Sequence, residues 1–472
     1  MRCRAVGLIL LGFVLLHCGE RERRPLNVVL ITLDTTRADH LGCYGSRAGA
    51  TPAIDRLAAR GVRFEQAGTV VPLTLPSHAT LLTGLLPQRH GLRVDGEGTL
   101  RSSVETLATV LSRRGFRTGA FVGSFALDHR FGLGRGFGVY DDAVTIDPQS
   151  APDSLDAERP AVAVADAALG WLRETGARPF FVWIHFYDAH APYAPPQPYR
   201  SRFPDSPYDG EIAYVDSQVA RILDYLDREN LRDHTIVAIA GDHGEGLGEH
   251  DESTHGLFLY ESTLRVPLII AAPSLRAHVV RESVSTTDVA PTLAALAGVP
   301  MNVVRLDGRD LSANLIQQRE PDPRDIFAET QYPRTFGWSD LGALRRDGKK
   351  LISGKLDELF DLNHDPHETT NIVQRDRGMY RELAAAMTPL RRRSIPRSTA
   401  AAGAASDDPR SMTAQFREFE SATALLKAND VPGALQRLQS LVKESPNNPA
   451  FQSALARAYE LSGNQDAAHP PP

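Results

Sequence analysis

The sequence of 472 residues contains little cysteine and only a modest net charge. Its three cysteines, Cys3, Cys18 and Cys43, are too few for a disulfide framework and lack the paired spacing of a zinc knuckle. The net charge of -6 and the lack of a basic stripe argue against binding of nucleic acid. An apolar content of 42% and a charged content of 23% are ordinary for a globular protein, and this length has room for one large domain and a smaller one.

The N-terminus has the pattern of an export signal. Two arginines precede an apolar run from Ala5 to Leu16, which is too short to span a bilayer but suits the central region of a signal peptide. The residues LLHC, ending at Cys18, resemble a bacterial lipobox, although His17 replaces the usual small residue. The alternative, a buried N-terminal helix, is disfavoured by the polar residues GERERRP that follow. We predict a signal peptide over residues 1–18 and export from a bacterial cytoplasm to the periplasm, with any membrane attachment confined to a lipid anchor at Cys18.

From residue 26 onward, short apolar runs alternate with amphipathic segments. Runs such as LNVVLITL, PFFVWIHFY and TIVAIAG are typical of buried strands, and the segments between them have helical spacing. This alternation predicts an α/β fold with a mainly parallel sheet sandwiched between helices. Asp34, Asp188 and Asp242 each stand at or just after the end of such a strand. Because ligands bind beyond the C-terminal ends of parallel strands, these three carboxylates mark the expected site.

The last third of the chain differs in character. Residues 325–390 contain short strands and turns, which predicts a small α+β lobe that completes a catalytic domain over residues 26–390. Residues 391–412 are basic and then rich in alanine and serine, as in a linker. Residues 413–468 have helical patterns that resemble tetratricopeptide repeats, whose period is about 34 residues, but fewer than two units are present. Such a tail is expected to pack on the main domain or to bind a protein partner.

The segment VPLTLPSHATLLTGLLPQRHGL places Thr74 immediately before an apolar helix that is expected to end near Gly84. A hydroxyl at that place lies at the positive end of the helix dipole and beside free backbone amides. It is suited to attack on an anionic centre once a metal lowers its pKa. On the local pattern alone, a helix N-cap is the more common role of a threonine.

Five separated matches, in order over residues 26 to 375, resemble the sulfatase family of the alkaline-phosphatase superfamily. They are LDTTRADHLGCYG with TPAIDRLAARGVRFEQA, LPSHATLLTGLLPQRHG, AGDHGEGLGEH with HGLFLYESTLRVPLII, VSTTDVAPTLAALAGVP, and ELFDLNHDP. The resemblance implies an alkaline-phosphatase-like core and a divalent metal beside the nucleophile. It carries the metal-ligand positions onto Asp34, Thr35, Asp242 and His243, with Thr74 as the nucleophile beside the ion.

Two departures from the family pattern bear on the metal. Thr35 stands where many sulfatases have a second aspartate, and His243 stands in the place of an asparagine. One carboxylate fewer and one imidazole more favour zinc or manganese over calcium or magnesium.

The segment HFYDAHAPY contains His190, which matches a substrate-contacting histidine of the family. Two interpretations stay open. Either Asp188, His190 and His255 hold a second metal ion, or His190 and His255 are acids that protonate the leaving group of a one-metal enzyme. His185, in the same segment, is expected simply to face a helix.

The nucleophile motif bears on the expected chemistry. Sulfatases of this family convert the first residue of C-x-P-S-R or S-x-P-S-R to formylglycine, whereas the motif here is TLPSH, from Thr74 to His78. The methyl group on the threonine Cβ prevents oxidation to an aldehyde, so no formylglycine is expected. Relatives with a threonine nucleophile and the pattern T-x-P-S/N-H act on phosphate diesters, phosphonates and phosphoethanolamine.

We therefore expect a metal-dependent hydrolase that uses Thr74 on phosphate diesters, phosphonates or related esters, either small molecules or components of the cell envelope. The candidates for binding the anionic substrate are His78, Arg89, His90 and Arg93, and an exposed basic turn is the alternative for the last three. The alternative functions are a sulfuric ester hydrolase of the same fold, a phosphoethanolamine-type transferase, and a non-catalytic scaffold whose helical tail recruits a partner. The presence of three candidate metal ligands argues against the scaffold.

Overall fold

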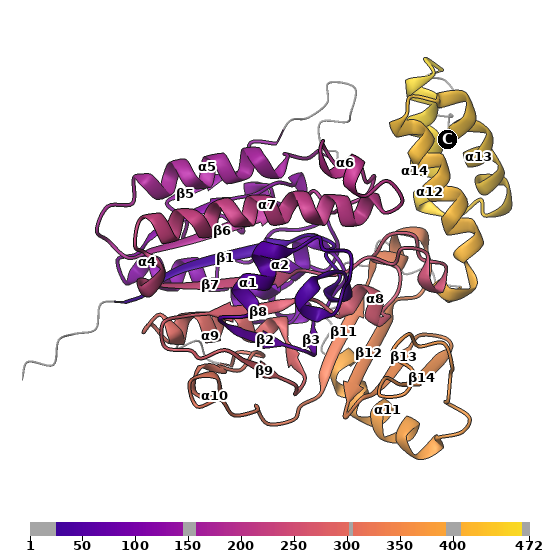
Figure 1. The fold of residues 1–472 in the computed structure, drawn as a ribbon. Coiled ribbons are helices and arrows are strands. Elements are labelled where there is room, and N and C mark those ends of the chain that lie inside the picture. The colour runs from indigo at the N-terminus through magenta and orange to yellow at the C-terminus, as the bar shows by residue number, and fades with distance from the viewer. Residues whose placement is uncertain (1–24, 145–156, 302–304, 393–406, 465–472) are drawn as a thin grey trace, which may run out of the picture.

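The computed structural model describes residues 25–144, 157–301, 305–392 and 407–464. In this part of the chain the centre of the molecule is a sheet of eight strands (Figure 1). Their order across the sheet is β5 (Val139–Asp141), β4 (Arg117–Phe121), β6 (Phe180–Phe186), β1 (Asn27–Leu33), β7 (Thr235–Gly241), β8 (Leu268–Ala271), β2 (Val62–Phe64) and β9 (His278–Val280). The expected signal peptide and Cys18 lie outside the described residues, and none of the described helices is long and apolar enough to cross a membrane.

Most neighbouring strands of this sheet run in the same direction. Strands β5, β4, β6, β1 and β7 are parallel, whereas β8 pairs antiparallel with both β7 and β2. The last strand, β9, is again parallel to β2. The prediction of a mainly parallel sheet is confirmed, and the parallel strands all present their C-terminal ends at one edge.

Strand residues point alternately to the two sides of the sheet, so both faces carry apolar side chains. Helices cover both faces. Val29 and Ile31 of β1 pack beneath α1 (Pro52–Ala58), α5 (Ala161–Arg173) and α7 (Pro207–Arg228). Val28 and Leu30 pack instead toward α2 (Thr74–Thr83), α4 (Leu107–Arg113), α9 (Val289–Leu296) and α10 (Ser312–Ile316). Figure 1 shows α5 and α7 above the sheet and α9 and α10 below it. Each large apolar side chain buried in these layers stabilises the fold by about 1.5–3 kcal/mol.

A smaller lobe follows in the chain, as expected. Its sheet is antiparallel, in the order β11 (Ile326–Thr330), β12 (Leu341–Arg346), β13 (Lys349–Ser353) and β14 (Asp357–Asp361), and α11 (Arg377–Arg392) packs on it. The remaining short elements are β3 (Ala67–Gly68), β10 (Val284–Ser285), α3 (Pro87–His90), α6 (Tyr199–Arg202) and α8 (Glu261–Leu264).

A buried ionic network joins the lobe to the main domain. Lys350 of β13, only 1% exposed, pairs at 2.9 Å with both Glu261 of α8 and Glu368. Arg345 of β12 pairs with Glu261 at 3.0 Å. Burial opposes ionisation of Glu261, but the two cations outweigh it and hold its pKa at about 2. The network ties α8, which follows the loop carrying His255, to the sheet of the lobe.

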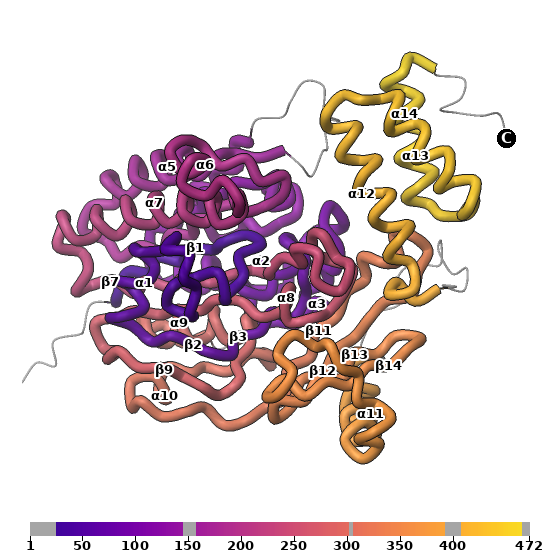
Figure 2. The backbone as a smooth tube through the Cα atoms, turned by 45° about the vertical axis from the view of Figure 1, so that its right-hand side comes forward, coloured from indigo at the N-terminus to yellow at the C-terminus, as the bar shows by residue number. Residues whose placement is uncertain are grey.

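The C-terminal segment forms helices α12 (Thr413–Lys427), α13 (Val431–Glu444) and α14 (Pro449–Leu461), as the sequence pattern predicts. It is attached to the rest of the molecule through an aromatic cluster in which Phe416 and Phe451 lie 5.5 and 6.0 Å from Phe336, measured between ring centres. Both views place α12 nearer to the main domain than α13 (Figures 1 and 2). Most of the predicted linker lies outside the described residues, and the likeness to tetratricopeptide repeats stays a prediction.

Candidate active site

The ends of two neighbouring strands bring two aspartates together. Asp34 follows β1 and Asp242 follows β7, and these strands pair in parallel with Leu33 opposite Gly241. Both carboxylates are therefore delivered to the same point at the C-terminal edge of the sheet, and both are at most 1% exposed.

Asp34, Asp242 and His243 form a group whose ligand atoms all lie within 4.8 Å of one another. Asp34 Oδ1 and Asp242 Oδ2 are buried and have no hydrogen-bond partner. His243 Nε2 lies 3.3 Å from Asp242 Oδ2 and 4.0 Å from Asp34 Oδ1. Its other nitrogen, Nδ1, lies 3.0 Å from the carbonyl oxygen of Gly244 and donates to it, so Nε2 carries the lone pair. Two orphaned carboxylate oxygens and one imidazole lone pair that converge fit a divalent metal ion.

The charges of this group also call for a cation. Burial raises the pKa of Asp34 to about 7, against the field of His255 and a hydrogen bond from Thr74. Burial and the nearby Asp34 raise the pKa of Asp242 well above its usual range. Burial lowers the pKa of His243, which keeps the imidazole neutral and able to bind a metal. Two buried carboxylates side by side are ionised readily only when a positive charge lies between them.

Thr74 is the first residue of α2 and is turned toward this group. Its Oγ1 lies 3.4 Å from both Asp34 Oδ2 and His243 Nε2. The N-cap residue of α2 is Leu73, and no side chain caps the helix. The hydroxyl therefore does not serve as the helix cap that the local pattern favours, and it stands between the candidate metal ligands and the start of the helix.

Asp95 and His78 hold the first turn of α2 in place. Asp95 Oδ1 accepts a hydrogen bond of 2.7 Å from the amide of Leu75, and its carboxylate also interacts with the amide of Thr74. His78 Nδ1 lies 2.8 Å from the carbonyl oxygen of Thr74, and its Nε2 lies 3.0 Å from the hydroxyl of Thr32. Both ring nitrogens of His78 are engaged in the interior, where the side chain holds the first turn of α2 against β1. Asp95 was not among the residues that the sequence singled out.

We expect Asp95→Ala to lower kcat about tenfold, because the first turn of α2 loses the acceptor that orients Thr74. KM and metal content should stay near their wild-type values, and Asp95→Asn, which keeps an acceptor oxygen, should restore most of kcat. Steady-state kinetics of the three proteins test this role. An equal loss in both variants would show that the charge of Asp95 matters rather than its hydrogen bond.

His185 is not where the sequence pattern placed it. It was expected to face a helix, but its Nε2 lies 3.0 Å from Asp34 Oδ2, and its Nδ1 accepts from the amide of Gly123 at 3.3 Å. The bond to Gly123 leaves the proton on Nε2, which donates to Asp34 and fixes the orientation of the carboxylate. This arrangement is that of a histidine behind a metal-binding carboxylate.

His190 and His255 face each other with their Nε2 atoms 3.2 Å apart. The outer nitrogen of each ring faces a backbone carbonyl oxygen, that of Ala191 at 2.7 Å and that of Pro72 at 3.2 Å. Burial lowers the pKa of both histidines to about 4. The ring of His255 also lies 4.2 Å from that of His243, measured between centres, so the pair adjoins the candidate metal ligands.

Asp188 lies apart from this pair. Its carboxylate interacts with the amide of Ala161 at the start of α5, and burial raises its pKa to about 7. No group of three candidate ligands among the described residues includes Asp188, His190 or His255. The structure therefore brings the two histidines together but does not bring Asp188 to them, which favours the acid pair over a second metal.

Thr35 is adjacent to Asp34 but its hydroxyl donates to the carbonyl oxygen of Ala189 at 2.7 Å. Its φ of 48° lies in the left-handed region, which is uncommon for a β-branched residue. The hydroxyl of Tyr208 donates to the carbonyl of Thr35 at 2.7 Å and helps to hold this conformation. The strained residue redirects the chain directly after Asp34.

The other predicted substrate-binding residues have partners within the protein. Arg89 pairs with Asp307 at 3.0 Å, and Arg93 pairs with Glu329 at 2.5 Å. His90 is fully buried, with Nε2 3.1 Å from the hydroxyl of Thr80 and Nδ1 accepting from the amide of Leu92. Burial lowers the pKa of His90 to about 3, so it is neutral.

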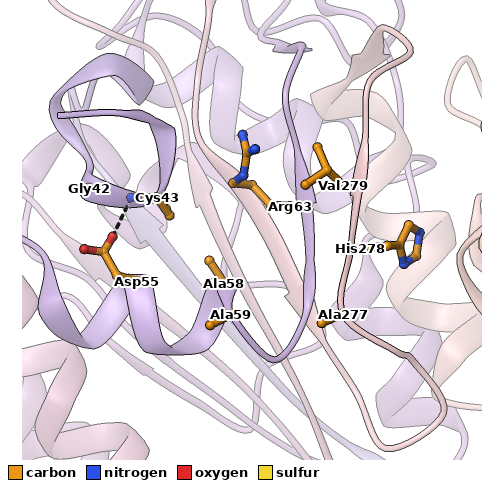
Figure 3. A pocket seen from close by; sticks show the side chains of 9 residues that line it. All are labelled: Gly42, Cys43, Asp55, Ala58, Ala59, Arg63, Ala277, His278 and Val279. Carbon is orange, nitrogen blue, oxygen red and sulfur yellow. Dashed lines mark hydrogen bonds between the residues drawn. The ribbon is translucent and has the colours of Figure 1, made fainter.

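A separate hollow of about 490 Å³ lies between α1 and the β2–β9 edge (Figure 3). The residues that line it are Gly42, Cys43, Asp55, Ala58, Ala59, Arg63, Ala277, His278 and Val279. Burial and the nearby Asp55 raise the pKa of Cys43 to about 12, so the thiol is protonated and a poor nucleophile. None of the candidate catalytic residues lines this hollow, and we assign it no chemistry.

Comparisons with known proteins agree with this fold. The family model described as "Sulfatase" matches residues 26–299, and that described as "N-sulphoglucosamine sulphohydrolase, C-terminal" matches residues 248–393. Arylsulfatase A of Homo sapiens is 28% identical over 450 residues, covering 79% of this chain and 89% of the relative. An arylsulfatase of Clostridium perfringens is 25% identical over 444 residues, covering 74% of this chain and 90% of the relative. The crystal structure of a phosphonate monoester hydrolase of Agrobacterium radiobacter superposes with a TM-score of 0.66 and 22% sequence identity. The superposition covers 78% of this chain and 96% of the hydrolase.

The chain belongs to the sulfatase family, since the family model spans more than half of it. It is a hydrolase of ester bonds with the mixed α/β core of that family. The family resemblance of the motifs is thereby confirmed, while the matched regions end at residue 393, before α12.

Proposed function

We propose that this hydrolase uses Thr74 as a nucleophile on phosphate diesters, phosphonates or related esters, with a divalent metal bound by Asp34, Asp242 and His243. The observation that carries the proposal is the position of Thr74 Oγ1, 3.4 Å from both Asp34 Oδ2 and His243 Nε2 at the start of α2. The dipole of this helix end favours an anionic ester group at the hydroxyl.

The residues of the chain divide the reaction between them. The Thr74 hydroxyl attacks phosphorus in line, with Asp34 Oδ2 within reach of its proton, and the oxygen–phosphorus bond to the leaving alcohol breaks. A phosphothreonine forms, and water then attacks its phosphorus and releases Thr74. A bound zinc or manganese ion, with calcium or magnesium as the less favoured choices, would lower the pKa of the hydroxyl and stabilise the charge on the ester oxygens.

His190 and His255 are proposed to protonate the leaving oxygen. The outer nitrogen of each ring faces a carbonyl oxygen, which can only accept a hydrogen bond. The two Nε2 atoms that face each other therefore compete for one proton. Since burial lowers the pKa of both rings to about 4, a proton taken up between them is strongly acidic and would pass readily to the leaving oxygen. Thr35, His78, Arg89, His90 and Arg93, which the sequence suggested for metal or substrate, are engaged in the protein's own contacts, so we give them supporting roles.

The threonine at position 74 argues against hydrolysis of sulfate esters through a formylglycine. Oxidation at the Cβ of threonine gives a ketone rather than an aldehyde, because Cβ carries a methyl group in addition to its bond to Cα. Sulfate esters therefore require direct attack by the hydroxyl if they are substrates. A phosphonate monoester hydrolase shares this fold, so the fold accommodates reactions at phosphorus.

Two alternatives remain. One is a transferase, which differs in the molecule that accepts the phosphoryl group, and the other is a scaffold that catalyses no reaction. In a phosphoethanolamine-type transferase, an alcohol replaces water in the second step. A scaffold without catalysis is disfavoured by the buried, unpartnered oxygens of Asp34 and Asp242, which are costly to retain without a ligand. Small-molecule or cell-envelope esters as substrates, a partner for the helical tail, and an exported or lipid-anchored location also remain proposals.

A screen of aryl esters with metal-replete protein tests the function. We expect bis(4-nitrophenyl) phosphate and 4-nitrophenyl phenylphosphonate to exceed 4-nitrophenyl sulfate in kcat/KM by at least about tenfold, or about 1.4 kcal/mol in transition-state stabilisation. 4-Nitrophenyl phosphate, a monoester, completes the set. A preference for the sulfate would replace the proposal by the sulfuric ester hydrolase.

A further inference from the structure

The loop of residues 244–255 ends at His255, one of the two histidines that are proposed to protonate the leaving oxygen. Its Nε2 lies 3.2 Å from that of His190. The loop closes on itself directly before this residue, because the amide of Gly246 donates to the carbonyl oxygen of Thr254 at 2.6 Å. The place of the imidazole therefore depends on the contacts that hold the two sides of His255.

The chain after His255 is held by the smaller lobe and by the segment that leads into α2. The carbonyl oxygen of Gly256 accepts from the hydroxyl of Thr330 in β11 at 2.6 Å. Gly256 has a φ of 97°, and a Cβ atom at this residue would lie 2.9 Å from Cδ2 of Leu73, the N-cap residue of α2. The imidazole Nδ1 lies 3.2 Å from the carbonyl oxygen of Pro72. On this side, His255 is fixed against the start of the helix that carries the nucleophile.

The chain before His255 is held by the C-terminal helices. The hydroxyl of Thr254, the preceding residue, donates to Glu420 Oε1 of α12 at 2.9 Å. One turn earlier on this helix, Arg417 pairs with Asp251 at 3.3 Å, but both of these side chains are more than half exposed, so the pair contributes little. Glu420 is therefore the residue of α12 whose contact bears on His255.

The docking of α12 has a basis of its own in aromatic packing. Phe416 of α12 is only 2% exposed, and its ring lies 5.5 Å from that of Phe336, measured between centres. The ring of Phe419, on the next turn, lies 5.2 Å from Phe336. Aromatic contacts of this kind bury much apolar surface. A change at Glu420 should therefore remove a contact with the loop while the helix stays in place.

We propose that Glu420 is a positioning residue of the active site, which acts on His255 through its hydrogen bond with Thr254. The inference rests on the proposed function, since it takes His255 as an acid that protonates the leaving oxygen. Such an acid must lie within hydrogen-bond reach of that oxygen, and a displacement of about 1 Å is enough to slow the transfer. The C-terminal helices, which follow the matched regions that end at residue 393, thereby take part in the reaction.

Two esters that differ only in their leaving group test this role. 4-Nitrophenyl phenylphosphonate releases a weakly basic phenolate, which needs little help from an acid, whereas phenyl phenylphosphonate releases a more basic one. Both give the same phosphonylated enzyme, and kcat/KM reports the step in which the leaving oxygen departs. We expect Glu420→Ala to lower kcat/KM about tenfold for the phenyl ester and by less than about twofold for the nitrophenyl ester. Glu420→Gln keeps an acceptor oxygen and should recover most of the loss.

The same contact can be broken from the loop. Thr254→Val lacks the hydroxyl and should show the same selective loss, whereas Thr254→Ser keeps the hydroxyl and should not. Because Thr254→Val leaves α12 unaltered, it tests the contact even where Glu420→Ala loosens the helix. The two changes combined should lose no more than either alone, since each removes the same hydrogen bond. The matched control is Glu418→Ala on α12, where Glu418 pairs with Arg437 and should affect neither ester.

The outcomes separate the positioning role from the proposed function, with His255→Ala as the reference. An equal loss for both esters in Glu420→Ala, or a selective loss that Thr254→Val does not share, would overturn the positioning role. A selective loss in His255→Ala with no change in Glu420→Ala would overturn it as well and leave the proposed function intact. An equal loss for both esters in His255→Ala would remove the acid role from the proposed function, and the inference would fall with it.

Discussion

Replacement of Thr74 by alanine is expected to lower kcat at least about a thousandfold, because the attacking oxygen is removed while the metal ligands remain. The side chain is small, so the free energy of unfolding should change by only about 1 kcal/mol. Activity toward an aryl phosphodiester, measured with metal-replete protein, checks the loss. Mass spectrometry of quenched wild-type reactions should also detect a phosphoryl group on the peptide that contains Thr74.

Two further variants make this result specific. Thr74→Ser keeps a hydroxyl at the same atom and should retain part of the activity. Thr83→Ala removes a hydroxyl from the last turn of the same helix, where it donates to the carbonyl of Ala79, and should leave the kinetics unchanged. Full phosphodiesterase activity in Thr74→Ala would refute the assignment of the nucleophile.

Asp242→Asn is expected to abolish metal-dependent stabilisation and to reduce activity at least about a thousandfold. The amide has the shape of the carboxylate but lacks its charge, and Asp242 Oδ2 is one of the two unpartnered oxygens in the candidate site. Wild-type protein should gain about 2.7 kcal/mol of stability when zinc or manganese is present at about 100 times its Kd. Thermal unfolding with and without the ion, together with metal analysis after dialysis, measures both effects.

The control for this change of charge is Asp166→Asn. Asp166 lies on α5 and pairs with Arg221 at the surface, far along the sequence from the candidate ligands. The Asp166→Asn variant should bind metal as the wild-type protein does. If Asp242→Asn kept a full complement of tightly bound metal, the ligand set would have to be revised.

The fold and the closeness of Asp34 to Asp242 could be anticipated because their signals are local. Buried strands of seven mostly apolar residues form β1, β6 and β7, and Asp34 and Asp242 stand directly after two of them. Parallel pairing then brings these strand ends together without further information. The identity of the ion, by contrast, depends on ligand distances that no sequence pattern specifies.

Asp95 and His185 could not be found in the same way. Asp95 stands in a loop without periodicity, and only the folded chain brings it to the amide of Leu75. His185 lies in a strand that is buried on both faces, so alternation does not tell which face meets the site. The docking of α12 depends on contacts such as Phe336 with Phe416, which are about 80 residues apart and carry no local signal.

The position of α12 has an evolutionary consequence. The helix lies beyond both family matches, which end at residues 299 and 393. A recombination event at the 3′ end of the gene would exchange the docked helices and leave Thr74 and the candidate metal ligands untouched. Such chains could therefore diversify by replacement of a terminal cassette, with no change around Thr74.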